Sequence, residues 1–187
     1  MDSGHVSNEA NLSYENLVST CRDKDLGVVR TGGEFRLIAV QAFSPGDLLF
    51  RIEGKRTHRP TRYSVQIGKD LHIDLGANHT TEETLDRFFW RFMNHSCAPN
   101  TIIRGQDVIA WREVDPWESV TFNYNTTEWC MAEPFTCRCG HDECLGTIQG
   151  FKHLTDQQRT LLRDFVAPHL ECWLPKEAPK RGRSPVA

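Results

Sequence analysis

Residues 91–100, with the sequence RFMNHSCAPN, form the stretch of this chain least suited to a hydrophobic core. Between Asn94 and Asn100 the chain carries an amide, an imidazole, a hydroxyl, a thiol, a proline and a second amide. Pro99 biases the residue before it toward extended backbone, so a helix that enters this segment should end there. We expect a polar loop at a helix end, whose groups either cap the helix around a buried Cys97 or face a ligand.

The composition is that of an ordinary folded protein. The chain has 187 residues, of which 39% are hydrophobic and 25% charged, so it can bury the core of one domain. The net charge of −3 is not typical of nucleic-acid binders, and we expect no direct binding of nucleic acid. No stretch resembles a signal peptide or a membrane span. These features predict an intracellular protein, cytoplasmic or nuclear, and leave the oligomeric state open.

Short β-prone runs make up most of the chain between Leu26 and Tyr124. Turn sequences such as TGG and SPGD separate them, and no helical crossover intervenes. Gly68 lies between two of the runs, where its freedom to adopt positive φ suits a tight hairpin. We therefore expect small curved antiparallel sheets. The runs are 26–30, 35–40, 48–52, 63–67, 71–75, 108–111 and 120–124.

Two segments have helical patterns. Thr80 and Glu83 form a capping box ahead of an apolar face that continues into the opening loop. Thr155 and Gln158 form a second box, and Pro168 should end or kink the helix that follows. The apolar residues at helical spacing are Leu85, Phe88, Phe89 and Phe92 in the first segment and Leu161, Leu162 and Phe165 in the second.

Three of the seven cysteines, Cys137, Cys139 and Cys144, follow the pattern C-x-C-x4-C. In a reducing compartment, clustered thiols are more often metal ligands or buried hydrophobic groups than disulfides. Tetrahedral zinc takes four ligands, with sulfur near 2.3 Å, so one ligand is missing locally. Spacing alone does not choose it, and the candidates are Cys97, Cys130, His141 and Cys172.

Together these segments resemble the SET-domain lysine methyltransferases that have a cysteine-rich post-SET segment. Residues 91–100 match the family's R-F-x-N-H-S-C-x-P-N motif, residues 118–124 (ESVTFNY) resemble its E-L-T-F-D-Y motif, and the cysteine triad has the post-SET spacing. The likeness implies a mainly β fold with few helices, in which small curved sheets form a pseudoknot that joins the first two motifs. The implied organisation is a flexible leader (1–20), a SET domain (21–130), a post-SET zinc segment (131–150), a C-terminal helical extension (151–174) and a disordered basic tail (175–187).

The resemblance also implies roles for single residues. S-adenosylmethionine is the implied cofactor, bound through Asn94, His95, Arg91 and Phe35. Cys97 is implied to complete a structural zinc site with the triad. Tyr124 is implied to be the active-site tyrosine, and Phe122 occupies the position that influences how many methyl groups are added, where Phe favours two or three. Tyr63 either lines the same channel or is a half-buried strand residue.

The chemistry that these roles imply is methyl transfer to the side-chain amine of a protein lysine, with a basic histone tail as one possible substrate. A free lysine with a pKa near 10.4 is mostly protonated at neutral pH, a penalty of about 4 kcal/mol. An apolar channel disfavours the ammonium and so lowers this pKa. Tyr124 can then orient the amine lone pair, and most of the remaining rate comes from alignment.

The chain departs from the family pattern at three places. Residues 34–36 stand where the family carries G-x-G, Ile52 replaces the tyrosine of E-Y-x-G, and Asn123 replaces the aspartate of T-F-D-Y. The absent tyrosine motivates one alternative, an enzyme that binds S-adenosylmethionine and acts on a small molecule. The other alternative is a zinc-stabilised binding module without catalytic activity.

Overall fold

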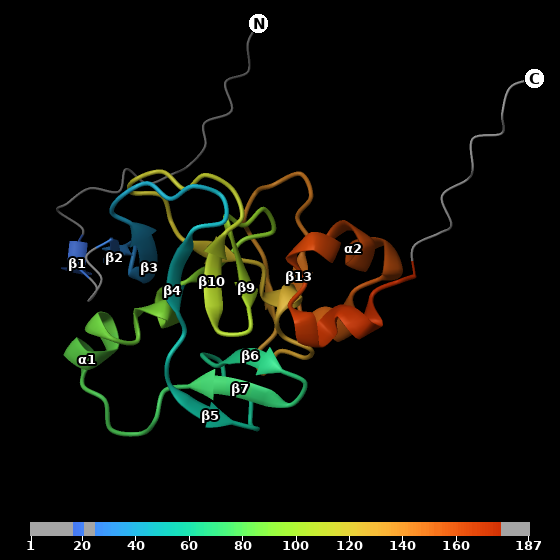
Figure 1. Cartoon of the computed structure of the whole chain (residues 1–187), viewed down its shortest axis with the longest axis horizontal. Coiled ribbons are helices and arrows are strands. Elements are labelled where there is room, and N and C mark those ends of the chain that lie inside the picture. The colour runs from blue at the N-terminus through green and yellow to red at the C-terminus, as the bar shows by residue number, and fades with distance from the viewer. Residues whose placement is uncertain (1–16, 21–24, 177–187) are drawn as a thin grey trace, which may run out of the picture.

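The structure is a computed structural model that describes residues 17–20 and 25–176. The rest of the expected leader and nearly all of the expected basic tail lie outside these residues. The described chain consists mainly of short strands in small sheets (Figure 1), which confirms the predicted fold class. No helix among the described residues is long and apolar enough to cross a membrane.

Within the described residues, three sheets have three antiparallel strands each, and two have two strands. The first contains β1 (Leu17–Thr20), β2 (Leu26–Thr31) and β3 (Glu34–Ala39); the second β4 (Leu48–Arg51), β10 (Asp107–Ala110) and β9 (Thr101–Arg104); the third β5 (Lys55–Thr57), β7 (Leu71–Asp74) and β6 (Val65–Gly68). The two-stranded sheets pair β8 (Asn94–His95) with β11 (Thr121–Phe122) and β12 (Phe135–Thr136) with β13 (Thr147–Ile148).

The hairpin between β6 and β7 differs from the expectation in two details. Gly68 does not adopt positive φ. It pairs with Leu71 as the last residue of β6, and Gln66 donates its side-chain amide to the carbonyls of Gly68 and Lys69. The side-chain hydrogen bonds thus close the turn without the backbone freedom of glycine. The strand also begins at Val65, so the expected start at Tyr63 is wrong.

The first helix is shorter than its apolar pattern predicted. α1 (Thr81–Asp86) has the expected capping box between Thr80 and Glu83. The backbone leaves the helical region at Phe88, and a separate 3₁₀ turn, η2 (Phe89–Phe92), follows. Phe88, Phe89 and Trp90 are all buried in the main core. Since three consecutive residues cannot share one helix face, the break allows all of them to reach the core.

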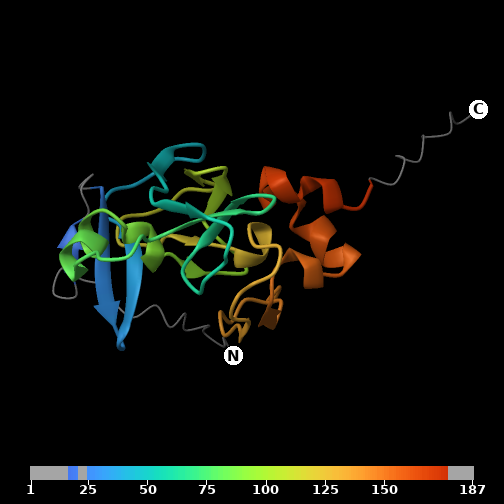
Figure 2. The same cartoon turned by 90° about the horizontal axis from the view of Figure 1, so that it is seen from below.

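The C-terminal segment is a series of short helices with its own small core. α2 (Asp156–Leu161) carries the predicted capping box of Thr155 and Gln158. Pro168 does not end it, because α2 has already stopped, and instead occupies the first turn of η6 (Pro168–Trp173). The other turns are η4 (Phe151–His153) and η5 (Arg163–Phe165). Figure 2 shows these elements at the opposite end of the molecule from the β1 to β3 sheet.

An arginine of the second sheet connects that sheet to the C-terminal elements through their backbone oxygens. Arg104 on β9 donates to the carbonyls of Asp164, Phe165 and Val166 at 2.6, 3.2 and 2.9 Å. The ring of Trp111 packs on that of Phe165 with centroids 4.8 Å apart. The C-terminal core thereby docks against the strands that lead to the candidate site.

Candidate functional site

The two polar motifs meet in a parallel pairing of β8 and β11. Asn94 pairs with Thr121 and His95 with Phe122. The buried side chain of Asn100 extends the contact, since its oxygen accepts the N–H of Thr121 and its amide donates to the carbonyl of Ser119, both at 2.8 Å. Segments that are distant in the sequence are therefore held side by side, as the resemblance implies.

Glu118 anchors the start of the second motif. Its carboxylate accepts hydrogen bonds from Asn100 and Arg112 and from the backbone N–H of Asp115. Burial would raise the pKa of Glu118, but these hydrogen bonds and the charge of Arg112 outweigh it and lower that pKa. The ionised carboxylate is thus part of the contact between the motifs.

Tyr124 follows β11 closely and begins the turn η3 (Tyr124–Thr126). The expectation that it lies in a strand is therefore wrong. The strand stops because Asn123 caps the turn, accepting the N–H of Asn125 with its side chain. The hydroxyl of Tyr124 donates to the carbonyl of Met93 at 2.8 Å, so the lone pairs of its oxygen remain available as acceptors. Burial, with a further contribution from the charge of Glu128, raises the pKa of Tyr124.

An aromatic cluster surrounds Tyr124. Phe122 is buried with its ring centroid 4.7 Å from that of Tyr124, and the ring of His95 packs edge-on at 5.3 Å. Phe135 contacts both His95 and Tyr124 from β12. Sequence reasoning missed Phe135, because an isolated aromatic residue between two motifs carries no signal of its partners.

His95 uses both ring nitrogens within the protein. Its Nδ1 accepts the backbone N–H of Tyr124 at 3.2 Å, and its Nε2 lies 3.3 Å from Sγ of Cys97. Burial lowers the pKa of His95 to about 4, so the imidazole is neutral at physiological pH. The side chain predicted to bind the cofactor therefore bridges Tyr124 and a cysteine.

Cys97 lies with Cys137, Cys139 and Cys144, and all four sulfurs are within 4.8 Å of one another. Cys97 is thus the cysteine that lies beside the triad, while Cys130 and Cys172 are exposed. Burial raises the pKa of Cys97. It would also raise that of Cys139, but hydrogen bonds from the backbone of His141 and Cys97 lower it to about 7.

The other predicted cofactor residues surround the same crossing. The amide of Asn94 donates to the carbonyl of Phe35 at 3.1 Å, and the ring of Phe35 stacks on Phe92. The guanidinium of Arg91 lies 4.3 Å from the ring centroid of Tyr63, and its Nε is buried without a hydrogen-bond partner. Tyr63 is 51% exposed and lies before β6, so its reading as a strand residue is wrong.

Glu128 is a further buried group that the sequence did not reveal. Its carboxylate accepts the backbone N–H of Gln66 at 2.7 Å and lies 3.6 Å from His72 Nε2. The side-chain oxygen of Gln66 in turn accepts the N–H of Trp129 at 2.7 Å. These bonds attach the β5 to β7 sheet to the segment that follows Tyr124, and a single acidic residue in TTEWC gives no sign of such a role.

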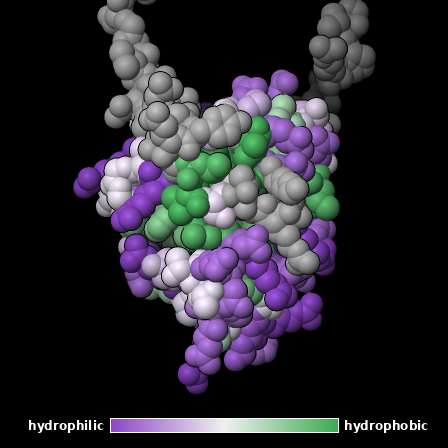
Figure 3. Space-filling model, turned by 90° about the vertical axis from the view of Figure 1, so that its left-hand side faces the viewer, coloured by the Kyte–Doolittle hydropathy of each residue, from purple (hydrophilic) through white to green (hydrophobic). Residues whose placement is uncertain are grey.

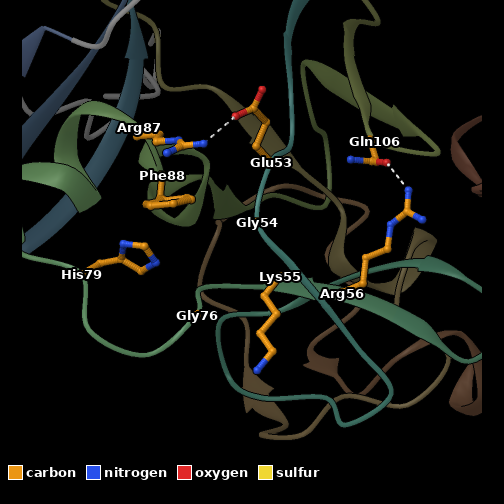
Figure 4. Close-up of a pocket in the computed structure, with 9 residues that line it drawn as sticks. All are labelled: Glu53, Gly54, Lys55, Arg56, Gly76, His79, Arg87, Phe88 and Gln106. Carbon is orange, nitrogen blue, oxygen red and sulfur yellow. Dashed lines mark hydrogen bonds and ion pairs between the residues drawn. The ribbon is translucent and has the colours of Figure 1, made fainter.

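Two surface hollows lie outside the group of residues around Tyr124 and the cysteine cluster. One, of about 450 Å³, is lined by Glu53, Gly54, Lys55, Arg56, Gly76, His79, Arg87, Phe88 and Gln106. Figure 4 shows its ion pair of Arg87 with Glu53 on one side of Gly54 and the hydrogen bond of Arg56 to Gln106 on the other. The second, of about 700 Å³, lies between β1 and α1, on the face in Figure 3 where apolar side chains gather above a hydrophilic lower half. Neither hollow includes a predicted site residue.

The departures from the family pattern have structural consequences. Ile52 is fully buried in the main core and supplies no hydroxyl where the family has a tyrosine. The side-chain nitrogen of Asn123 is buried without a hydrogen-bond partner, although its oxygen caps η3. Residues 34–36 belong to β3 and pair with β2, and the carbonyl of Phe35 holds Asn94.

A mainly β fold, a contact between two motifs and a four-cysteine cluster near a partly buried tyrosine are the features of a SET-type protein. A family model described as the SET domain matches residues 8–125, more than half of the chain. The chain therefore belongs to the SET domain family, as the sequence motifs indicated. Several of its curated relatives are described as methyltransferases.

Methyltransferase flvH of Aspergillus flavus is 31% identical over 117 residues, which cover 60% of this chain and 58% of that protein. An H3 lysine-36 specific histone-lysine N-methyltransferase of Gibberella zeae is 27% identical over 142 residues, covering 67% of this chain and 15% of that protein. A protein of the same description from Cryptococcus neoformans is 37% identical over 96 residues, covering 47% of this chain and 10% of that protein. The chain thus spans little more than half of the first relative and a small part of the others.

Among solved structures, the chain is similar to KRYPTONITE in complex with mCHH DNA, an H3(1-15) peptide and SAH. The TM-score is 0.47 at 20% identity, and the match covers 66% of this chain and 29% of that one.

Proposed function

We propose that this chain uses S-adenosylmethionine to methylate the side-chain amine of a lysine in a protein. The observation that carries the proposal is the hydrogen bonding of the Tyr124 hydroxyl, beside the pairing of β8 with β11. Its hydroxyl donates to the Met93 carbonyl, so its oxygen can accept a hydrogen bond from an amine N–H. A hydrogen bond from the amine N–H to this oxygen fixes the direction of the nitrogen lone pair.

The surroundings of Tyr124 suit the uncharged amine that methyl transfer needs. The raised pKa of Tyr124 keeps the phenol protonated, so it serves as a hydrogen-bond partner and not as a tyrosinate base. Phe122 and Phe135 supply apolar surface, which disfavours the ammonium form of a substrate lysine. Fixing the geometry of an amine in this way accounts for a large part of an enzymatic rate enhancement.

The residues predicted to bind the cofactor divide into those that shape its site and one that can bind its carboxylate. S-adenosylmethionine, when bound, supplies the methyl group from its sulfonium. The side chains of Asn94 and His95 are already engaged with Phe35, Tyr124 and Cys97, so we assign them to shaping the binding loop. The guanidinium of Arg91 lies against the ring of Tyr63, and its buried Nε has no hydrogen-bond partner, so we assign its positive charge to a carboxylate of the cofactor.

The cysteine cluster fits a structural zinc ion. A Zn–S bond of about 2.3 Å places tetrahedral sulfurs about 3.8 Å apart, and the sulfurs of Cys97 and Cys137 are 3.9 Å apart. Four thiolates leave no open coordination position, so the metal would stabilise structure and not activate a substrate. It would attach residues 137–144 to the loop that carries Asn94 and His95.

A histone is the substrate class favoured by the relatives. The proteins of Gibberella zeae and Cryptococcus neoformans are described as specific for lysine 36 of histone H3. A histone substrate would place this protein in the nucleus. The expectation that it binds no nucleic acid stays a prediction.

The test is transfer of a labelled methyl group from S-adenosylmethionine, with core histones, free lysine and small amines offered in parallel. We expect label in histone protein, and Tyr124→Phe should remove most of it. Label found only in small amines would replace the proposal with a small-molecule enzyme. Tight cofactor binding without any transfer would indicate a binding module without catalytic activity.

A further inference from the structure

The side chain of His95 connects the cysteine cluster to the backbone of Tyr124. One ring nitrogen, Nδ1, is 3.2 Å from the amide nitrogen of Tyr124, and the other, Nε2, is 3.3 Å from Sγ of Cys97. The hydroxyl at the other end of Tyr124 bonds the carbonyl of Met93. Both ends of the tyrosine are therefore attached to residues 93–95, and these lead directly to Cys97.

The contacts determine where the proton of the imidazole lies. A backbone N–H can only donate, so Nδ1 must accept and carries no proton. A ring whose Nδ1 carries no proton is protonated at Nε2, and that N–H points to the sulfur of Cys97. The same sulfur accepts the backbone N–H of Leu145 at 3.4 Å. Two N–H groups therefore point at the sulfur of Cys97, and a sulfur bound to metal as a thiolate can accept both hydrogen bonds.

We propose that His95 is a positioning residue that couples the four-cysteine metal site to Tyr124. Metal binding fixes Sγ of Cys97, the sulfur fixes the imidazole ring, and the ring fixes the amide of the tyrosine. The inference rests on the proposed zinc site. It adds a second effect of the metal, which would order Tyr124 as well as the post-SET segment. Groups that orient metal ligands through a second hydrogen bond commonly have this effect.

The competing explanation is that His95 only fills space. Its ring packs edge-on against Tyr124 and Phe135, with centroids at 5.3 and 5.7 Å, and packing alone would not require a particular tautomer. The position of the proton therefore separates the two explanations. Long-range ¹H–¹⁵N correlation spectra of the zinc-loaded full chain with ¹⁵N-labelled histidine should show His95 protonated at Nε2 only. Protonation at Nδ1, or a mixture of tautomers, would overturn the proposal.

Two substitutions separate the two hydrogen bonds. In His95→Asn the side-chain oxygen can replace Nδ1 as acceptor, but no donor reaches Cys97. In His95→Gln the longer amide can replace the Nε2 donor. Zinc affinity, measured by competition with a chromophoric chelator, should fall about 10- to 100-fold in His95→Asn and much less in His95→Gln. Equal losses in both variants would indicate packing only.

His153→Asn is the matched control, because His153 is an exposed histidine 3.8 Å from Sγ of Cys130, outside the cluster. Its zinc affinity should equal that of the wild type. Cobalt-loaded His95→Asn should show its thiolate charge-transfer bands at longer wavelength, since a sulfur that loses a donor gives up electrons more easily. If the wild type bound no zinc, the proposed metal site and its coupling to Tyr124 would both fail. Zinc binding with the wrong tautomer would overturn the role of His95 alone.

Discussion

Replacing Glu128 by alanine should destabilise the fold and disturb Tyr124 together. Glu128 is buried, and its carboxylate accepts the backbone N–H of Gln66 at 2.7 Å. Its own N–H donates to the carbonyl of Tyr124 at 3.0 Å. The residue therefore joins the β5 to β7 sheet to the turn that presents the tyrosine.

The magnitude follows from the groups that lose a partner. A hydrogen bond to a charged group contributes about 1.5–3 kcal/mol, and a buried donor left without an acceptor costs about 1–3 kcal/mol. The His72 contact is 3.6 Å, too long for a hydrogen bond, so we assign it no energy. Glu128→Ala should thus lower the free energy of unfolding by about 3 kcal/mol. Glu128→Gln keeps an oxygen for Gln66 and should cost about 1 kcal/mol.

Urea unfolding followed by far-ultraviolet circular dichroism measures these differences, with Glu113→Ala as the control at an exposed acidic position. We expect the order Glu113→Ala, Glu128→Gln, Glu128→Ala for increasing loss of stability. Methyl transfer should decrease in the same order. A Glu128→Ala variant within about 0.5 kcal/mol of the control, which is the range of ordinary surface substitutions, would refute the reasoning.

Three other changes test separate parts of the site. The wild type should contain about one zinc per chain by elemental analysis, and Cys97→Ser should lose it whereas Cys172→Ser should keep it; zinc retained in Cys97→Ser would exclude the proposed ligand set. Because the pKa of Glu118 is lowered on folding, its ion contributes stability above about pH 4.3 that disappears as pH falls through the lowered pKa. Glu118→Gln should therefore be less stable at pH 7 and lose less stability on acidification, as unfolding curves between pH 3 and 7 can measure. Phe122→Tyr should shift products from di- and trimethyl-lysine toward monomethyl-lysine in intact-mass spectra, and an unchanged distribution would contradict the role assigned to Phe122.

Local signals in the sequence predicted local structure well. Both capping boxes occur as expected, since Thr80 and Glu83, like Thr155 and Gln158, need only each other to satisfy the helix end. The turn-bounded runs contain strands, although some strands are shorter than predicted, because β-prone residues and turn sequences act over short segments. The resemblance placed Cys97 with the triad, which spacing alone could not do.

The predictions that were wrong concern features that depend on contacts between distant segments. The helix expected to reach Phe92 breaks at Phe88 because three aromatic residues compete for the same core. Tyr63 was a plausible strand residue by pattern, yet its ring is exposed beside Arg91. The link from Cys97 through His95 to Tyr124 depends on the parallel pairing of β8 with β11, and no local pattern specifies that pairing.

The most direct test of the central claim is tandem mass spectrometry of core histones incubated with the full chain and S-adenosylmethionine. The account predicts methyl groups on the side-chain nitrogen of lysine, at a level at least 100-fold lower for Tyr124→Phe, the scale of loss that follows when reacting groups are misplaced by about 1 Å. Methylation of another residue type, or full activity of Tyr124→Phe, would contradict it.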